Sequence, residues 1–119
     1  MSTTQLDDRL DLVFHALADR TRRALIRRLA STGPAKITDL AEPFRMSLPA
    51  VSKHLRVLES AKLVTREIDG RIHRCAFVPE PLATAEVWLE GYRSFWEGTL
   101  DALADFVEKP KRGRKRKAR

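Results

Sequence analysis

The chain has 119 residues, of which 43% are hydrophobic and 33% are charged, and its net charge is +7. This length allows one domain with a modest core, and the composition favours a folded chain over a disordered one. The single cysteine, Cys75, excludes an internal disulfide and a metal site built on a cysteine pair. No apolar run approaches the ~20 residues of a membrane span, and no signal peptide is recognisable. We therefore expect a cytoplasmic protein without a membrane partner.

The positive charge is concentrated at the C-terminal end. Residues 109–119 contain eight basic side chains and no acidic one, whereas the remaining 15 basic residues nearly balance the 16 acidic residues. We therefore divide the chain into a folded domain at 1–108 and a disordered basic tail at 109–119. Such a tail favours an anionic polymer as partner, above all nucleic acid, and the alternative is a solvated tail that only keeps the protein soluble.

Apolar residues at spacings of three and four predict an amphipathic helix at 7–17. Its apolar face consists of Leu10, Val13, Phe14 and Leu17. Asp19 is a favourable N-cap for a second helix, which Gly33 and Pro34 should end. The second helix is expected to bury Leu25, Ile26 and Leu29 and to expose Arg22, Arg23, Arg27 and Arg28.

Two further helices are predicted before the middle of the chain. Thr38 is expected to cap a short third helix, which Pro43 should end because proline lacks the donor that a helix interior requires. Ser47 is expected to cap a fourth helix that extends to about Ser60, with Pro49 tolerated in its first turn. The buried stripe of the fourth helix is predicted to contain Leu48, Val51, Leu55 and Leu58.

A hairpin and a long final helix complete the predicted order. Strand-like runs at 63–68 and 71–78 flank Asp69-Gly70, which is a strong signal for a two-residue hairpin turn. The final helix is predicted over 81–108 and carries a wide, aromatic apolar stripe. We interpret the stripe as core or dimer interface, and the alternative is the wall of a ligand pocket. It contains Trp88, Leu89, Tyr92, Phe95, Trp96, Leu100, Leu103, Phe106 and Val107.

Two helices joined by a short turn and followed by a hairpin form the arrangement of a winged helix-turn-helix. The predicted fold class is therefore mainly α with a β-hairpin wing. The fourth helix is the candidate for insertion into the major groove of DNA, which is about 12 Å wide. Its polar face and N-terminus offer groups that bond bases or phosphates and small apolar groups that contact thymine methyls. The expected DNA contacts are Ser47, Pro49, Ala50, Ser52, Lys53, His54 and Arg56.

Two parts of this prediction have open alternatives, and further candidates lie in the strands and the tail. His54 lies beside the buried stripe, so packing at the helix boundary is an alternative to a contact with DNA. Arg71, next to the turn glycine, either enters a minor groove or is solvated. Arg66 and Arg74 in the strands are candidates for phosphate contacts. In the tail, Lys111, Arg112 and Arg114 are expected to attract phosphates.

The run from Met46 to Val64, MSLPAVSKHLRVLESAKLV, resembles the signature of ArsR-type winged helix-turn-helix transcriptional repressors. Leu17 to Leu25, LADRTRRAL, resembles the start of the second helix in the same family, and Asp69-Gly70-Arg71 fits its wing tip. The resemblance covers roughly residues 10–107. It implies a DNA-binding repressor that forms a homodimer mainly through its first and last helices. The interface residues would include Phe14, Tyr92, Phe95, Trp96 and Leu103.

The sequence departs from the metal sensors of that family. Those proteins carry a cysteine pair on the third helix, or carboxylate and histidine ligands on the last helix. Residues 37–43 contain no cysteine, residues 81–108 contain no histidine, and the three histidines of the chain are scattered. The chain therefore resembles the branch without a metal site, and we predict no metal or cofactor and name no small-molecule effector.

Three function classes follow from these observations. The leading prediction is a sequence-specific repressor that binds double-stranded DNA at a palindromic operator. The alternatives are a non-specific nucleoid-type protein that binds DNA or RNA, and a ligand-responsive sensor of the same fold. An enzyme is not expected, because the sequence contains no Gly-x-Ser-x-Gly elbow, phosphate-binding loop, HExxH zinc helix or dinucleotide fingerprint.

Overall fold

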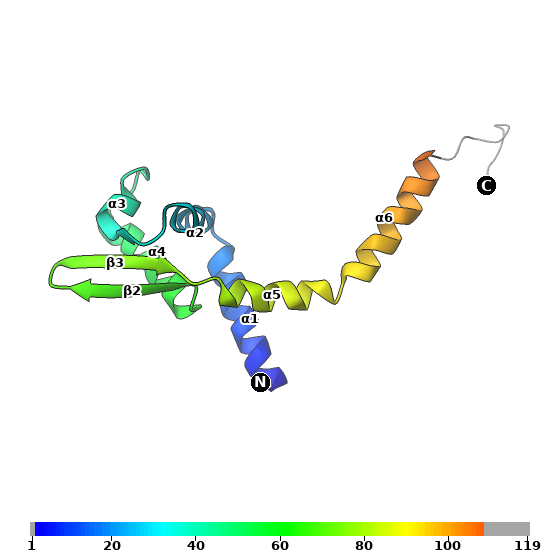
Figure 1. The fold of residues 1–119 in the computed structure, drawn as a ribbon, viewed down its shortest axis with the longest axis horizontal. Coiled ribbons are helices and arrows are strands. Elements are labelled where there is room, and N and C mark those ends of the chain that lie inside the picture. The colour runs from blue at the N-terminus through cyan, green and yellow to red at the C-terminus, as the bar shows by residue number, and fades with distance from the viewer. Residues whose placement is uncertain (1, 109–119) are drawn as a thin grey trace. The chain divides into compact units, whose positions relative to one another are not determined.

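The computed structural model describes residues 2–108, and Figure 1 shows their helices and strands. The chain divides into two compact units, of which the N-terminal unit ends at Ala85 and the C-terminal unit begins at Glu86. The elements are α1 (Thr3–Leu17), α2 (Arg20–Thr32), β1 (Ala35–Lys36), α3 (Ile37–Ala41), α4 (Leu48–Ser60), β2 (Val64–Asp69), β3 (Ile72–Phe77), α5 (Glu80–Glu90) and α6 (Arg93–Glu108). The predicted basic tail lies outside the described residues.

Side-chain caps set the starts of the three long helices in the N-terminal unit. Ser2 and Gln5 form a capping box, so α1 begins four residues before the predicted start. The Asp19 carboxylate accepts the backbone N–H of Arg22 at 3.1 Å, which confirms the predicted cap of α2. The Ser47 hydroxyl accepts the backbone N–H of Ala50 at 3.2 Å, which confirms the predicted cap of α4.

The start of the third helix was predicted wrongly. Thr38 lies inside α3, and the N-cap is Lys36, whose side chain makes no capping hydrogen bond. The reason is a short strand, β1, which holds the chain extended up to Lys36 by pairing with β3. This strand makes the wing sheet three-stranded and antiparallel, in the order β1-β3-β2.

The hairpin loop lies one residue later than predicted. Asp69 pairs with Ile72, so the two loop residues are Gly70 and Arg71 rather than Asp69 and Gly70. Gly70 has a φ of 63°, which glycine adopts without strain at the first position of such a loop. Alternation along β3 buries Cys75 and exposes Ile72 and Arg74, so the hairpin has an inner face toward the core and an outer face toward solvent.

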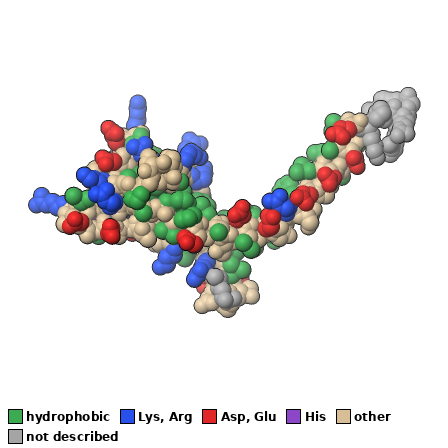
Figure 2. Space-filling view, viewed as in Figure 1, with side chains coloured by type: hydrophobic (Ala, Val, Ile, Leu, Met, Phe, Trp, Pro, Cys, Tyr) green, Lys and Arg blue, Asp and Glu red, His purple; other side chains and the backbone are tan. Residues whose placement is uncertain are grey.

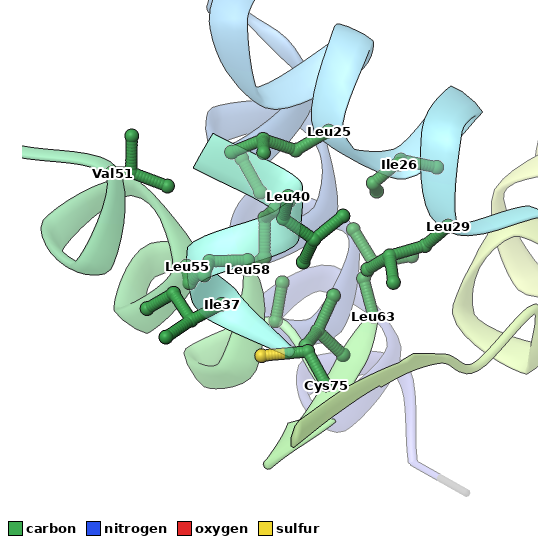
Figure 3. Close-up of a cluster of buried hydrophobic side chains, with 13 residues drawn as sticks. Leu25, Ile26, Leu29, Ile37, Leu40, Val51, Leu55, Leu58, Leu63 and Cys75 are labelled. Carbon is green, nitrogen blue, oxygen red and sulfur yellow. The ribbon is translucent and has the colours of Figure 1, made fainter. Parts of the chain in front are cut away.

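The main core joins α2, α3 and α4 to the sheet (Figure 3). The predicted stripes Leu25, Ile26 and Leu29 of α2 and Val51, Leu55 and Leu58 of α4 are all buried. Leu48 is the exception, because its side chain is 42% exposed. It is the first residue of α4, and the buried part of the helix starts one turn later at Val51.

Cys75 is fully buried within this core. Burial raises the pKa of its thiol, because the thiolate would lose its hydration. The thiol is therefore protonated and packs as a small apolar side chain.

The single final helix predicted over 81–108 is wrong, because the chain forms two helices. α5 ends at Glu90 and α6 begins at Arg93. Gly91 donates its N–H to the carbonyl of Trp88, and Tyr92 donates to that of Leu89. Both hydrogen bonds span three residues, as in a 3₁₀ turn, and they end α5. Glycine has the lowest helix propensity after proline, so this position is a weak point of a continuous helix.

The C-terminal unit exposes most of its large apolar side chains (Figure 2), and no residue of α6 is buried. Two edge-to-face ring pairs lie in this unit: the ring centroids of Trp88 and Tyr92 are 5.2 Å apart, and those of Phe95 and Trp96 are 6.1 Å apart.

Of the described helices, none is long and apolar enough to cross a membrane. We call the exposed apolar side chains of α6 the α6 stripe. They are Phe95, Trp96, Leu100, Leu103, Phe106 and Val107.

Candidate nucleic-acid interface

Helix α4 exposes two cations opposite its buried stripe. Lys53 and Arg56 are both exposed, and within residues 2–108 no hydrogen bond or ion pair engages either charged group. Side chains of this type bond guanine edges and phosphate oxygens. Their charges are therefore available to an anionic ligand.

The other predicted contacts on α4 fall into two groups. Ser47 and Pro49 are exposed in the first turn, and the Ser47 hydroxyl, although it caps the helix, keeps its own hydrogen to donate. Ala50, Ser52 and His54 are half-buried. The contacts of Ser52 and His54 show why.

His54 lies at the boundary between α4 and the first two helices. Its Nδ1 is 3.3 Å from a terminal nitrogen of Arg22 and 3.9 Å from the Asp19 carboxylate. Because a guanidinium only donates, Nδ1 is the acceptor in the contact with Arg22. These contacts are those of packing at the helix boundary, and the contact of His54 with DNA stays a prediction.

Of the four arginines predicted to be exposed on α2, Arg23 and Arg27 are exposed, whereas Arg22 and Arg28 are half-buried. For Arg22, hydrogen bonds to α1 give the reason. Its Nε donates to the carbonyl of Ala16 at 2.7 Å, and a terminal nitrogen donates to that of His15 at 3.0 Å. These carbonyls belong to the last turn of α1, where the His15 carbonyl also accepts the backbone N–H of Ala18. Arg22 thus ties α1 to α2 and holds His54 of α4 at the same junction.

Asp19 offers a test of this junction. The pKa of its carboxyl is lowered, chiefly by the hydrogen bond from the Arg22 N–H and further by the nearby His54 and Arg22. We expect Asp19→Ala to lower the free energy of unfolding by about 1 kcal/mol, whereas Asp19→Asn, which keeps a capping oxygen, should lose less. Because the folded-state pKa is depressed, the stabilisation from ionised Asp19 exists above the unfolded pKa and is lost as pH falls through the folded value. Urea unfolding at neutral and acidic pH measures both effects, and an equal loss for both variants would contradict the capping role.

Arg66 was predicted as a candidate phosphate contact, but its guanidinium is engaged by partners within the protein. Its side chain is only 11% exposed and points to the inner face of the hairpin, where Nε donates to the Glu59 carboxylate at 2.5 Å. One terminal nitrogen lies 3.4 Å from the Ser52 hydroxyl and 3.2 Å from His73 Nδ1, and the other donates to the Ser52 carbonyl at 3.4 Å. We call Glu59, Ser52, His73 and Arg66 the Arg66 cluster.

The sequence analysis missed this cluster, although one signal was available. Arg66 follows buried Val64 by two residues, so strand alternation places both on the inner face. Likewise, Ser52 and Glu59 are seven residues apart and share one face of α4. The sequence did not indicate that the α4 face with Ser52 and Glu59 packs against the β2 face with Arg66.

The tip of the hairpin carries Arg71, which is exposed. Figure 2 shows basic side chains projecting from this end of the N-terminal unit. Arg74, on the outer face, is also exposed. Within residues 2–108, neither guanidinium group makes a hydrogen bond or an ion pair, so both remain available to phosphates.

Each predicted interface residue in the described chain is exposed in its own unit. Phe14 lies on α1 with 40% exposure, and Tyr92, Phe95, Trp96 and Leu103 lie in the C-terminal unit. The predicted tail contacts Lys111, Arg112 and Arg114 lie outside the described residues. Across residues 2–108, no three His, Cys, Asp or Glu side chains form a group that could hold a metal ion.

A cavity of about 510 Å³ opens between α1, the end of α4 and the start of α5. Its size lies within the range of small-molecule sites. Apolar side chains line it together with the cations of Arg9 and Lys62 and the carboxylate of Glu80. The apolar part consists of Leu12, Val13, Ala61, Val78 and Pro81.

Comparison with known proteins agrees with this geometry. A family model described as a helix-turn-helix domain matches residues 17–67. The HTH-type transcriptional regulator Rv2034 of Mycobacterium tuberculosis is 38% identical over 108 residues, which cover 91% of this chain and 94% of that protein.

Solved structures extend the likeness to three dimensions. The crystal structure of an ArsR family transcriptional regulator, RHA00566, is 42% identical, with a TM-score of 0.71 over 76% of this chain and 93% of that one. A homodimeric winged helix-turn-helix DNA-binding domain, Mb0332 of Mycobacterium bovis, shares the fold at 24% identity and a TM-score of 0.61, covering 80% of this chain and 91% of that one. The chain belongs to the ArsR family of winged helix-turn-helix proteins and is a DNA-binding transcriptional regulator.

Proposed function

We propose that the protein is a sequence-specific repressor that acts as a homodimer on an imperfect palindrome. Each subunit inserts α4 into a major groove, and the two half-sites lie about one helical turn, or ~34–36 Å, apart. The observation that carries this proposal is the pair of exposed cations on α4, Lys53 and Arg56, which have no partner within residues 2–108 and lie on a helix whose other face is buried. Occupation of a promoter by the dimer blocks transcription.

The proposed contacts divide by their chemistry. Lys53 and Arg56 read base edges, Ser47 and Ser52 bond bases or phosphates, and Pro49 and Ala50 contact thymine methyls. Arg71 and the tail residues Lys111, Arg112 and Arg114 bind the backbone or minor groove. The protein acts in the cytoplasm by binding rather than by catalysis.

The homodimer is supported by the exposed apolar surfaces of the chain. The residues of the α6 stripe and Tyr92 are each at least half exposed and Phe14 is 40% exposed, and contiguous exposed apolar surface of this kind is typical of an interaction site. A second copy that covers these side chains removes their apolar area from water, which is favourable. The homodimeric state of Mb0332 in solution, which its name records, points in the same direction.

Selection of bound DNA from a random pool at physiological salt tests the function. A palindrome with half-sites one turn apart should be enriched, because a two-fold symmetric dimer presents α4 twice in opposite orientation. Recovery of unenriched DNA would contradict the proposal and favour the non-specific nucleoid-type alternative.

Deletion of residues 109–119 is expected to weaken binding to all DNA sequences alike. The segment carries eight cations and no acid, and each phosphate contact that is lost lowers the slope of log affinity against log salt by about 0.9. Titrations of the selected operator and of a scrambled duplex at several salt concentrations measure this. An unchanged slope would show that the tail does not contact DNA.

The cavity beside α5 favours a second candidate function, a ligand-responsive regulator. Its apolar lining suits an aliphatic chain, and its two basic residues, Arg9 and Lys62, outnumber the one acidic residue, Glu80, so a medium-chain carboxylate is the candidate ligand. A thermal-shift series of carboxylates of increasing chain length tests this. The expected stabilisation should disappear in Lys62→Glu, and the absence of any shift in the wild-type protein would contradict it.

A further inference from the structure

The Arg66 cluster joins the recognition helix α4 to both strands of the wing. Arg66 belongs to β2, its guanidinium bonds Ser52 and Glu59 on α4, and it also bonds His73 on β3. One side chain therefore connects the helix that carries Lys53 and Arg56 to the hairpin that carries Arg71 at its tip.

Stability alone does not explain such a cluster. A largely buried ion pair loses much of its Coulomb attraction to desolvation, and an apolar replacement of similar volume is often neutral. The side chains of Arg66 and Glu59 are 11% and 29% exposed, so both have given up much of their hydration. What the cluster provides is a defined orientation of the hairpin relative to α4, because a guanidinium is planar and its N–H donors have fixed directions.

All three nitrogens of the guanidinium contribute to this orientation. Nε is directed to Glu59, one terminal nitrogen is shared by the Ser52 hydroxyl and His73, and the other is directed to the Ser52 carbonyl. The contact with His73 requires an unprotonated Nδ1, since arginine has no acceptor to offer. A rotation of the hairpin against α4 would break several of these bonds together.

We propose that Arg66 is a positioning residue that sets the angle between the wing and α4, so that Arg71 and the α4 cations engage one DNA duplex together. This rests on the proposed function. Arg66 itself does not touch DNA, because its donors face Glu59, Ser52 and His73 within the protein. Its effect on binding is transmitted through Arg71.

A double-mutant cycle tests this coupling with the full-length protein and the selected operator. We expect Arg71→Ala to reduce affinity about tenfold in the wild-type background, which corresponds to one contact of ordinary strength. In the Arg66→Met background, Arg71→Ala should change affinity less than about twofold, because the wing no longer reaches its contact. Hydroxyl-radical footprints of Arg66→Met should lose protection at the wing positions and keep it at the centre of each half-site.

Two further variants keep the test decisive. Arg66→Lys retains the charge but not the planar fork, so it should uncouple Arg71 even if Arg66→Met folds poorly. Arg27→Met removes one cation from the exposed face of α2 and should leave the effect of Arg71→Ala at about tenfold. A purely structural role of Arg66 would lower the melting temperature without changing the effect of Arg71→Ala.

The outcomes separate this proposal from the proposed function. If replacement of Lys53 and Arg56 lowers operator affinity but Arg71→Ala has the same effect in both backgrounds, or no effect in either, the positioning role of Arg66 is wrong and the function stands. If replacement of Lys53 and Arg56 has no effect, the proposed function itself is wrong.

Discussion

The combined substitution Lys53→Ala and Arg56→Ala is expected to abolish the preference for operator over random DNA. Both side chains are exposed on α4 without partners in the described chain, so their loss removes DNA contacts without unpairing any protein group. Base contacts of this kind contribute about 1–3 kcal/mol each, so the pair should cost roughly 30-fold to 10⁴-fold in operator affinity. Competition titrations with a scrambled duplex measure the change in preference.

The control removes two exposed cations elsewhere in the N-terminal unit. Arg27→Ala with Lys36→Ala lowers the net charge by the same amount, so it reports the general loss of attraction to phosphate. We expect it to weaken operator and scrambled DNA equally and slightly. Since α4 is anchored by Val51, Leu55 and Leu58 and neither Lys53 nor Arg56 contributes to that packing, the melting temperature of the α4 variant should stay close to that of the wild type. Retained operator preference in the α4 variant would show that another element reads the sequence.

The substitution Phe95→Asp is expected to convert the dimer into monomers. Phe95 belongs to the α6 stripe and is 67% exposed in the single chain, and in the proposed dimer its ring is covered by the partner. A carboxylate there must be desolvated without a counter-charge, which costs several kcal/mol. Operator affinity should fall with the dimer, because a monomer contacts only one half-site.

Sedimentation velocity over a range of concentrations measures this result. Asp101→Lys on the same helix reverses a charge and should leave the dimer intact, because Asp101 does not belong to the α6 stripe. The core of the N-terminal unit contains no residue of α6, so circular dichroism should show that unit still folded in Phe95→Asp. A variant that sediments like the wild-type dimer would show that the α6 stripe is not the interface.

The features predicted correctly are those that neighbouring residues decide. An aspartate or serine before a helical run caps it whatever the rest of the chain does, and this held at Asp19 and Ser47. The spacing of Leu25, Ile26 and Leu29 marks the buried side of α2 because a helix repeats every 3.6 residues. Exposure of Lys53 and Arg56 follows from the same periodicity.

The features predicted wrongly depend on distant partners. β1 has only two residues and exists because β3 pairs with it, so the true start of α3 could not be read from Thr38 and its neighbours. The hairpin register sets the loop at Gly70 and Arg71, although Asp69-Gly70 carries the stronger local signal. At Gly91 the helical period continues through the break, which conceals the end of α5.

By itself, the sequence determined that this is a winged helix-turn-helix regulator and that Lys53 and Arg56 are exposed on α4, since periodicity, capping and the α4 signature are all local. Only the tertiary structure decided what the remaining polar residues do: Arg66 turned from a candidate DNA contact into the link between α4 and the wing, and His54 became part of the α1–α2 junction. A side chain's partners are set by whichever elements pack against it. That packing depends on the whole fold, so the residues next to Arg66 or His54 in the sequence do not reveal the partners of these side chains.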